Sequence, residues 1–208
     1  MLVLESVGRV INRPVGHIFF SEGEGADFAL LIRKGHVKVV MGKPPRIVAI
    51  RGPGEIVGEV APIRHKPRSG SVIALDEVEV LHLPAAEWLR FLYENPRAMH
   101  AQLVAADERL DQAARKIIES DLAIEQRLAK ALVELVDSGV GEHRGEGVIL
   151  RFSQQDLATL TGASLDSVKK IIRTLKDEKL IGTGRQTLVI HDVPTLIEIA
   201  DGNRTASP

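Results

Sequence analysis

Residues 152–175 read Phe-Ser-Gln-Gln-Asp-Leu-Ala-Thr-Leu-Thr-Gly-Ala-Ser-Leu-Asp-Ser-Val-Lys-Lys-Ile-Ile-Arg-Thr-Leu, the layout of two short helices joined by a tight turn. Ser153 can cap the first helix, with Asp156 as its capping-box partner three residues later. Gly162 permits the turn, and Ser164 can cap the second helix. Two β-prone runs follow, at 180–181 and 187–190. The stretch therefore predicts a winged helix-turn-helix within residues 121–200.

The second helix of this motif has a basic outer face. Its shared core with the first helix would be Leu157, Leu160, Val168, Ile171, Ile172 and Leu175, while Lys176 and several polar neighbours stay outside. Such a helix fits the DNA major groove, with cations on phosphates and N-terminal residues on base edges. The candidate DNA-contacting residues are Ser153, Gln154, Gln155, Ser164, Leu165, Asp166, Ser167, Lys169, Lys170, Arg173 and, at the wing tip, Arg185. A plain helical hairpin with a solvated face is the alternative, and the two caps followed by a hairpin favour DNA binding.

Residues 1–95 have a different sequence pattern, in which short β-rich runs are separated by glycines. The runs are at 15–20, 28–32, 37–41, 47–50, 71–75 and 78–83. Many short strands with turn signals at this spacing are typical of a sandwich or barrel. We predict an antiparallel β jelly roll, closed by a short helix over 85–93, and hence an α+β protein overall.

A long helix is predicted over residues 96–120, where nothing breaks the pattern after Pro96. Leu103, Leu110, Ile117 and Ile124 recur every seventh residue, with Ala106 and Ala113 between them. This seam predicts a homodimer. The alternative is that the stripe packs on its own barrel, but so long a helix overhangs one small domain. We place the hinge between domains near Ser120.

Composition narrows the function classes. The 208 residues hold 27 Lys and Arg against 28 Asp and Glu, so nucleic-acid binding must depend on a local basic patch. The absence of cysteine excludes disulfides, thiolate catalysis and iron–sulfur clusters. No leader or membrane-length apolar run is found, which predicts a cytoplasmic protein with no membrane partner. The polar residues 201–208 are predicted to be a disordered tail.

The chain resembles the CRP/FNR family of bacterial transcription factors over nearly its whole length. The resemblance is carried by Gly54-Glu-Ile-Val-Gly-Glu-Val-Ala61, by Pro67-Arg-Ser69, by the long helix and by residues 153–180. It implies a phosphate-binding cassette, with a cyclic nucleotide, cAMP or cGMP, as effector. Gly58, Glu59, Val60 and Ala61 would form its first part, and Arg68 and Ser69 its second.

The chemistry of these residues agrees with that implication. Arg68 supplies a fork of donors matched to a phosphodiester, Ser69 adds a hydroxyl, and Glu59 can accept from a ribose hydroxyl. Taken alone, Glu59 and Arg68 would more often be a surface ion pair. By the resemblance, Gln112 and Ala113 stand where a relative's Thr-Ser pair contacts the base, so base selectivity stays open.

The second helix also departs from the family. Relatives carry Ser-Arg-Glu-Thr-Val-x-Arg, where this chain has Ser164-Leu-Asp-Ser-Val-Lys-Lys170. Leu165 cannot pair with guanine but could touch a thymine methyl, Asp166 could accept from cytosine, and Lys170 replaces a more selective arginine. The family's usual half-site is therefore not expected.

We predict an effector-responsive, sequence-specific transcription regulator, not an enzyme, whose partners are duplex DNA, a second copy of the chain and, as a further candidate, RNA polymerase. Two alternatives stay open: a different effector or none, and a C-terminal domain that binds protein. A cupin-type enzyme would need closely spaced histidine ligands with a carboxylate and is set aside. The seven histidines are scattered and form no ligand cluster, so neither a metal nor haem is expected.

Overall fold

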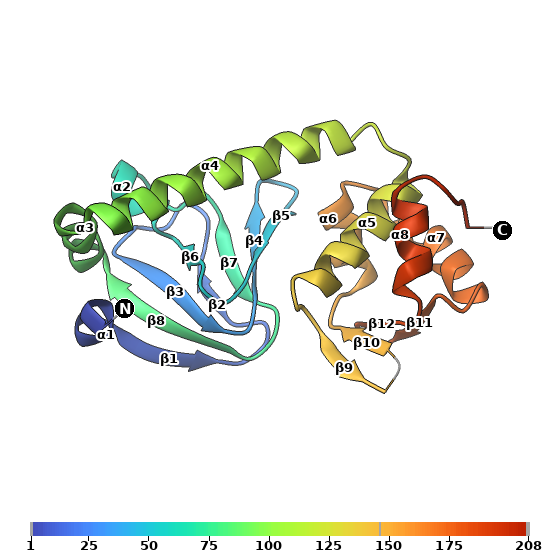
Figure 1. Ribbon diagram of the computed structural model, residues 1–208, viewed down its shortest axis with the longest axis horizontal. Coiled ribbons are helices and arrows are strands. Elements are labelled where there is room, and N and C mark those ends of the chain that lie inside the picture. Colours follow the sequence, from blue (N-terminus) through green and yellow to red (C-terminus); the bar gives the residue numbers. More distant parts are fainter. Residues whose placement is uncertain (1, 146, 207–208) are drawn as a thin grey trace. The chain divides into compact units, whose positions relative to one another are not determined.

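The structure of the protein is a computed structural model that describes residues 2–145 and 147–206. The chain forms two compact units that divide between Ala114 and Arg115 (Figure 1). The predicted boundaries at residues 95, 120 and 200 stay predictions.

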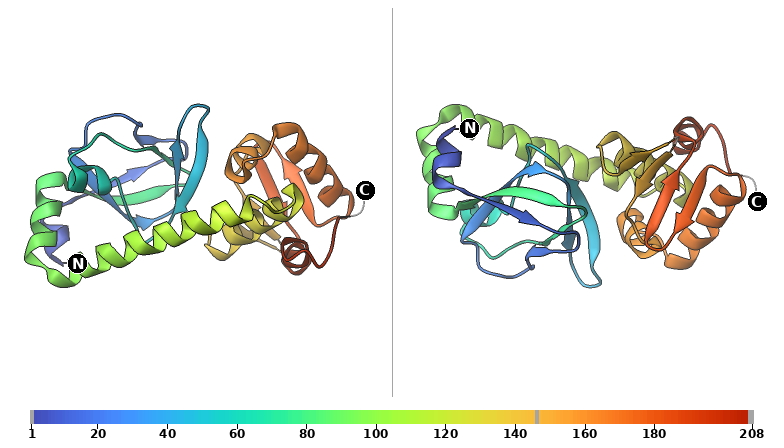
Figure 2. Two further views of the ribbon diagram at one scale, coloured as in Figure 1. Left: turned by 90° about the horizontal axis from the view of Figure 1, so that it is seen from above. Right: turned by 90° about the horizontal axis from the view of Figure 1, so that it is seen from below.

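The N-terminal unit is built on two four-stranded antiparallel sheets (Figure 1 and Figure 2). One has the order β1 (Arg9–Arg13), β8 (Val78–Pro84), β3 (Phe28–Lys34), β6 (Ile56–Val57). The other has the order β2 (Ile18–Phe20), β7 (Ser71–Ala74), β4 (Val37–Met41), β5 (Arg46–Arg51). Side chains from both sheets, such as Phe20, Leu30, Val37 and Val80, make one buried cluster. The predicted antiparallel β domain is confirmed, and β1 is an addition that the sequence runs did not indicate.

Helices cover the outer face of the first sheet. The residues Leu4 of α1 (Leu2–Val7) and Trp88 and Leu92 of α3 (Ala85–Glu94) are buried against Ala29, Leu81 and Leu83 of β3 and β8. Successive residues of a strand point to opposite faces of the sheet, so β3 and β8 contribute side chains both to this cluster under the helices and to the buried cluster shared by the two sheets. Helix α1 was not predicted, because six residues are too few to show a helical period.

The long helix α4 spans Pro96–Glu119 and has no buried residue within its own chain. Leu103, Leu110 and Ile117 are 67%, 68% and 72% exposed. Ile124, the predicted fourth position of the seam, begins α5 (Ile124–Asp137) instead, because the chain leaves the helix between Ser120 and Ala123. The seam on α4 therefore has three large positions.

The C-terminal unit combines helices with a sheet of order β11-β12-β10-β9. Its elements are α5, β9 (Glu142–Arg144), β10 (Gly147–Leu150), α6 (Gln154–Thr161), α7 (Leu165–Asp177), β11 (Ile181–Gly184), β12 (Thr187–Ile190) and α8 (Val193–Ala200). Strands β9 and β10 are additions to the two β-prone runs expected in this unit. Helix α8 was not predicted either, since Pro194 discourages a helical interpretation although it is tolerated in the first turn.

The predicted disordered tail, 201–208, has contacts in its described part. Arg204 pairs with Glu178 at 2.8 Å, and the Ala206 amide donates to a Glu125 carboxylate oxygen at 2.8 Å. The last two residues of that prediction lie outside the described residues.

Candidate functional site

A tight backbone turn links β6 to the short helix α2 (Val60–Arg64) in the N-terminal unit. Gly58 has φ +78°, and a Cβ there would lie 2.7 Å from Arg68 Nη1 and 2.9 Å from the Phe20 ring. Glycine is needed for the backbone conformation and for this close approach. The turn brings Gly58 and Glu59 next to Arg68, ten and nine residues further along the chain.

Arg68 lies inside the unit, with 2% of its surface exposed. Its Nη1 and Nη2 donate to the carbonyl oxygens of Gly58 and Phe28 at 2.6 and 2.8 Å. The guanidinium carbon stands 4.1 Å and 4.5 Å from the ring centroids of Phe20 and Phe28, in cation–π geometry. Its ion-pair partner, Asp27, is 3.9 Å away on a side chain that is 86% exposed.

This arrangement leaves the charge of Arg68 incompletely matched. Its Nε is buried and has no hydrogen-bond partner among the described residues. Burial lowers the pKa of Arg68, and Asp27, Glu24 and Glu59 act in the opposite direction. A buried guanidinium with a free donor, paired only with a solvated carboxylate in the described part of the chain, is a place that favours an anion.

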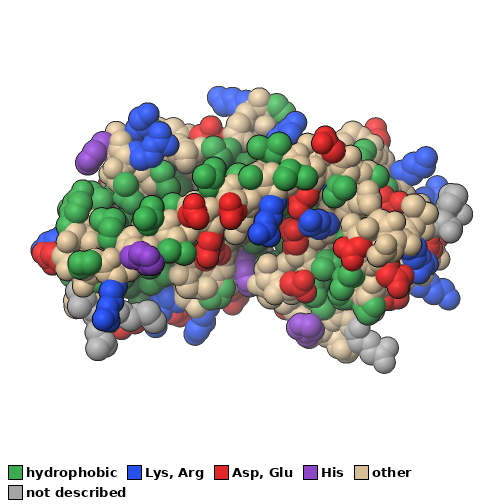
Figure 3. Space-filling view, turned by 45° about the horizontal axis from the view of Figure 1, so that its top comes forward, with side chains coloured by type: hydrophobic (Ala, Val, Ile, Leu, Met, Phe, Trp, Pro, Cys, Tyr) green, Lys and Arg blue, Asp and Glu red, His purple; other side chains and the backbone are tan. Residues whose placement is uncertain are grey.

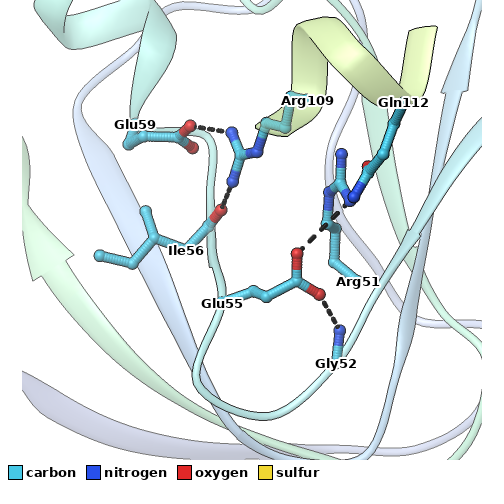
Figure 4. A network of polar contacts seen from close by, with 7 residues as sticks. All are labelled: Arg51, Gly52, Glu55, Ile56, Glu59, Arg109 and Gln112. Atoms are coloured by element: carbon cyan, nitrogen blue, oxygen red, sulfur yellow. Dashed lines mark hydrogen bonds and ion pairs between the residues drawn. The ribbon is translucent and has the colours of Figure 1, made fainter. Parts of the chain in front are cut away.

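Glu59 is 1% exposed and forms an ion pair with Arg109 of α4 (Figure 4). Arg109 Nη2 also donates to the Ile56 carbonyl oxygen at 2.6 Å. The carboxylate that sequence reasoning assigned to a ribose hydroxyl is therefore held by a cation from the long helix. This pair ties the cassette to α4.

Gln112 and Ala113 lie one helical turn further on. Gln112 accepts a hydrogen bond from Arg51 Nη1 at 2.9 Å, and Arg51 lies 3.4 Å from a Glu55 carboxylate oxygen (Figure 4). Burial lowers the pKa of Arg51, while Glu55 raises it. Gln112 thus contacts the strand end at Arg51, and Ala113 is exposed.

The remaining cassette residues surround these groups. Ala61 is buried, whereas Val60 and Ser69 are exposed. The structure therefore gathers Gly58, Glu59 and Arg68 closely, and leaves Gln112 in a separate contact.

The helix-turn-helix has the predicted local chemistry. Ser153 Oγ accepts from the Asp156 amide at 3.0 Å, and the Ser153 amide donates back to Asp156 at 3.1 Å. Gly162 ends α6 with φ +67°, and Ser164 Oγ accepts from the Ser167 amide at 3.1 Å. Both serine oxygens are thereby occupied as helix caps.

The outer face of α7 is exposed and cationic. Lys169, Lys170, Arg173 and Lys176 are exposed there, as is Asp166, which lies 3.7 Å from Lys169. Leu165 is half-buried. Four of the six predicted core residues are fully buried, Leu157, Val168, Ile172 and Leu175, and Leu160 and Ile171 are half-buried.

The wing and the first helix supply the other predicted residues. Arg185 and Gln186, with φ +56° at Gln186, form the exposed turn between β11 and β12. Gln155 is exposed at the start of α6, and Gln154 is half-buried. The predicted DNA-contacting residues thus lie at the start of α6, along α7 and in the β11–β12 hairpin of the same unit.

Sequence reasoning missed three contributors to the cassette: Arg109, Phe20 and Phe28. Arg109 could have been suspected, because it lies on the same side of α4 as Gln102 and Gln112 and off the heptad seam. The two aromatic residues lie on separate strands, and only the sheets bring them to Arg68.

Within the described ranges, no group of three His, Asp or Glu side chains is placed to hold a metal ion. None of the helices in the described part is long and apolar enough to cross a membrane.

Comparison with known proteins places both units. Residues 11–95 match the model of the cyclic nucleotide-binding domain, and residues 126–199 that of the Crp-like helix-turn-helix domain. The cyclic AMP receptor protein of Thermus thermophilus is 28% identical over 200 residues, covering 91% of this chain and 87% of that protein. A CRP-like cAMP-activated global transcriptional regulator of Mycobacterium tuberculosis is 25% identical, covering 88% and 84%.

Solved structures agree on the fold. A CRP/FNR-family transcriptional regulator from Thermus thermophilus has a TM-score of 0.80 at 21% identity, covering 96% of this chain and 100% of its own. These relatives are regulators and not enzymes, as the sequence predicted. The chain therefore belongs to the CRP/FNR family and is a DNA-binding transcription regulator with a cyclic nucleotide-binding domain.

Proposed function

We propose that the protein is a homodimeric regulator whose affinity for specific DNA sites is set by a cyclic nucleotide, cAMP or cGMP, bound at the Gly58–Ser69 cassette. The observation that supports a cyclic-nucleotide effector is the buried guanidinium of Arg68. Its Nε has no partner among the described residues, and its ion-pair partner in that part of the chain is the exposed carboxylate of Asp27. A cyclic phosphodiester carries one negative charge and acceptor oxygens that suit such a fork.

The ion pair between Glu59 and Arg109 connects this site to the long helix. A ribose hydroxyl that donates to Glu59 would compete with Arg109 for the same carboxylate, so binding would loosen or move α4 at that turn. The packing of two α4 helices around Leu110 and Ile117 would change in response. The hinge near Ser120 would then reset the spacing of the two recognition helices.

The dimer is supported by the exposed seam of α4. Figure 3 turns the upper side of Figure 1 forward and shows hydrophobic side chains exposed on that face. Leu103, Leu110 and Ile117 repeat every seven residues on one side of the helix. An apolar stripe with this period favours a partner helix of the same kind.

Sequence-specific binding is supported by the face of α7. Asp166, Lys169 and Lys170 lie in its N-terminal half, where a recognition helix meets base edges, and Arg173 and Arg185 are exposed and long enough to reach phosphates. We expect a half-site that differs from the family's usual one, because Leu165 offers only apolar contact.

The effector proposal is tested by calorimetric titration of cAMP and cGMP into the whole protein and into two variants. Arg68→Ala alone would leave the Gly58 and Phe28 carbonyls unpaired and could unfold the domain, so Arg68→Lys is the primary variant and Ser69→Ala the second. We expect saturable binding of one nucleotide, weakened at least about tenfold in Arg68→Lys, since lysine cannot form a fork. No heat from either nucleotide would overturn the cyclic-nucleotide assignment and leave DNA binding standing.

The DNA assignment is tested separately by fluorescence anisotropy on duplex fragments at several salt concentrations. We expect a steep salt dependence that falls when Lys169 and Lys170 are both changed to alanine. Glu87→Ala, on α3 of the other unit, serves as the control. Binding that is independent of salt, or unchanged in the double variant, would instead favour a protein partner for this domain.

A further inference from the structure

The segment between β2 and β3, residues 21–27, reads Ser-Glu-Gly-Glu-Gly-Ala-Asp and runs beside the cassette arginine. The Gly23 amide donates to the Arg68 carbonyl oxygen, and the Arg68 amide donates to the Glu24 carbonyl oxygen, both at 2.9 Å. These two hydrogen bonds fasten the acidic segment, residues 21–27, to the part of the cassette that carries Arg68.

Two side chains of the acidic segment bring negative charge to Arg68. The Asp27 carboxylate lies 3.9 Å from Arg68 Nη2 on a side chain that is 86% exposed, and Glu24 is exposed as well. Burial lowers the pKa of Arg68, and Asp27, Glu24 and Glu59 raise it, in that order. Since a carboxylate that lies in solvent comes this close to Nη2, a phosphate can approach the guanidinium from the same side, where it meets Asp27.

The charge of the third carboxylate, Glu59, is already matched. Glu59 is 1% exposed and is paired with Arg109 of α4. The cassette therefore has one buried cation, Arg68, beside two solvent-exposed carboxylates. Their repulsion of a ligand is proportional to its charge, so it is twice as large for a phosphomonoester with two negative charges as for a phosphodiester with one.

We propose that Asp27 and Glu24 form a charge filter, which makes the cassette select a phosphodiester with one negative charge over a phosphomonoester with two. The filter concerns the effector site of the proposed function and rests on that function. A cyclic nucleotide and the 5′-monophosphate formed by its hydrolysis share the same base and ribose, so the charge of the phosphate is a property by which a protein can separate them. Nucleoside di- and triphosphates carry more charge and are rejected on the same ground.

The test is calorimetric titration of the full chain at pH 8 and low salt, where the repulsion is little screened. Three probes with the same nucleoside are compared: cAMP, 5′-AMP and the methyl ester of 5′-AMP, and likewise the three guanosine compounds. The methyl ester has the open chain of the monophosphate but a single negative charge, so it separates charge from ring shape. In the parent protein we expect the methyl ester to bind more tightly than the monophosphate.

Isosteric variants identify the charges. Asp27→Asn and Glu24→Gln should each narrow the affinity ratio of methyl ester to monophosphate by at least about threefold, and both together by about tenfold, the effect of one or two charges at about 7 Å in a largely aqueous setting. Glu22→Gln is the matched control from the same segment. Its carboxylate accepts from the Gly42 amide at 2.8 Å, a bond that glutamine can keep, and the ratio should stay within about twofold of the parent.

The outcomes separate this inference from the proposed function. If a cyclic nucleotide binds but the ratio is unchanged in the double variant, or the monophosphate binds the parent more tightly than its methyl ester, the charge filter is overturned and the proposed function stands. If a cyclic nucleotide binds but neither open-chain probe binds the double variant, ring shape makes the selection and the filter is again overturned. No heat from any probe in the parent and the double variant would overturn the proposed function and the filter with it.

Discussion

Removing Arg109 should destabilise the N-terminal unit, because it leaves the Glu59 carboxylate buried without its cation. Breaking a buried ion pair by deleting one partner costs about 3–5 kcal/mol. The Arg109 side chain is 24% exposed, which lets water reach part of the gap, so we take the lower value, about 3 kcal/mol. With a urea m-value of about 2 kcal/mol/M, the midpoint should fall by about 1.5 M in Arg109→Ala.

Urea unfolding followed by Trp88 fluorescence is the assay, at one fixed protein concentration because the proposed dimer links stability to concentration. Trp88 reports the unit that holds the pair. Arg97→Ala is the matched control, since Arg97 is an exposed arginine of the same helix, and should stay within about 0.5 kcal/mol of the parent.

A double-mutant cycle tests the interaction itself. Glu59→Gln should cost about 1–2 kcal/mol, since Arg109 keeps the Ile56 carbonyl as partner. Glu59→Gln combined with Arg109→Ala should be less unstable than the two single losses together, by at least about 1 kcal/mol. Full additivity, or an Arg109→Ala protein as stable as Arg97→Ala, would refute the reasoning.

Three further outcomes are expected. Hydrogen bonds from the Thr195 amide and hydroxyl hold the pKa of Asp192 below its usual range, so this cap of α8 stabilises fully above the ordinary carboxylate pKa and fades as pH falls through its lower folded value. Asp192→Ala should thus cost about 1 kcal/mol at neutral pH and progressively less in acid, and an equal loss in urea melts at about pH 2 would contradict this. Leu110→Asp should yield monomers in sedimentation velocity, while Tyr93→Asp, an exposed apolar site on α3, should leave the sedimentation coefficient unchanged. Arg173→Ala should reduce the slope of log affinity for DNA against log salt by about 1, and an unchanged slope would remove Arg173 from the phosphate contacts.

Local signals were the most informative part of the sequence. The cap of α6 depends on Ser153 and Asp156, three residues apart, and the cap of α7 on Ser164, so their geometry follows from adjacent chemistry. The core of the helix-turn-helix follows equally from the helical period. These features need no knowledge of the rest of the chain.

Contacts between distant segments could not be predicted in the same way. Glu59 and Arg109 are fifty residues apart, and Arg68 meets Phe28 from forty residues away. Nothing in the sequence indicates that Arg68, predicted to bind the phosphate of an effector, also donates hydrogen bonds to two backbone carbonyls. That information lies in how two sheets close around one side chain.

Because α4 is uninterrupted, the number of residues between its functional positions fixes the sides of the helix on which they lie. Its 24 residues contain no glycine and no proline after Pro96, and at 1.5 Å per residue they make a rod of about 36 Å. A single inserted residue would rotate everything beyond it by about 100°. Inserted between Arg109 and Ile117, it would keep the ion pair between Arg109 and Glu59. It would turn the part of the apolar stripe after the insertion away from the part before it. Insertions in this helix should therefore be tolerated chiefly as seven-residue units, which restore both faces at once.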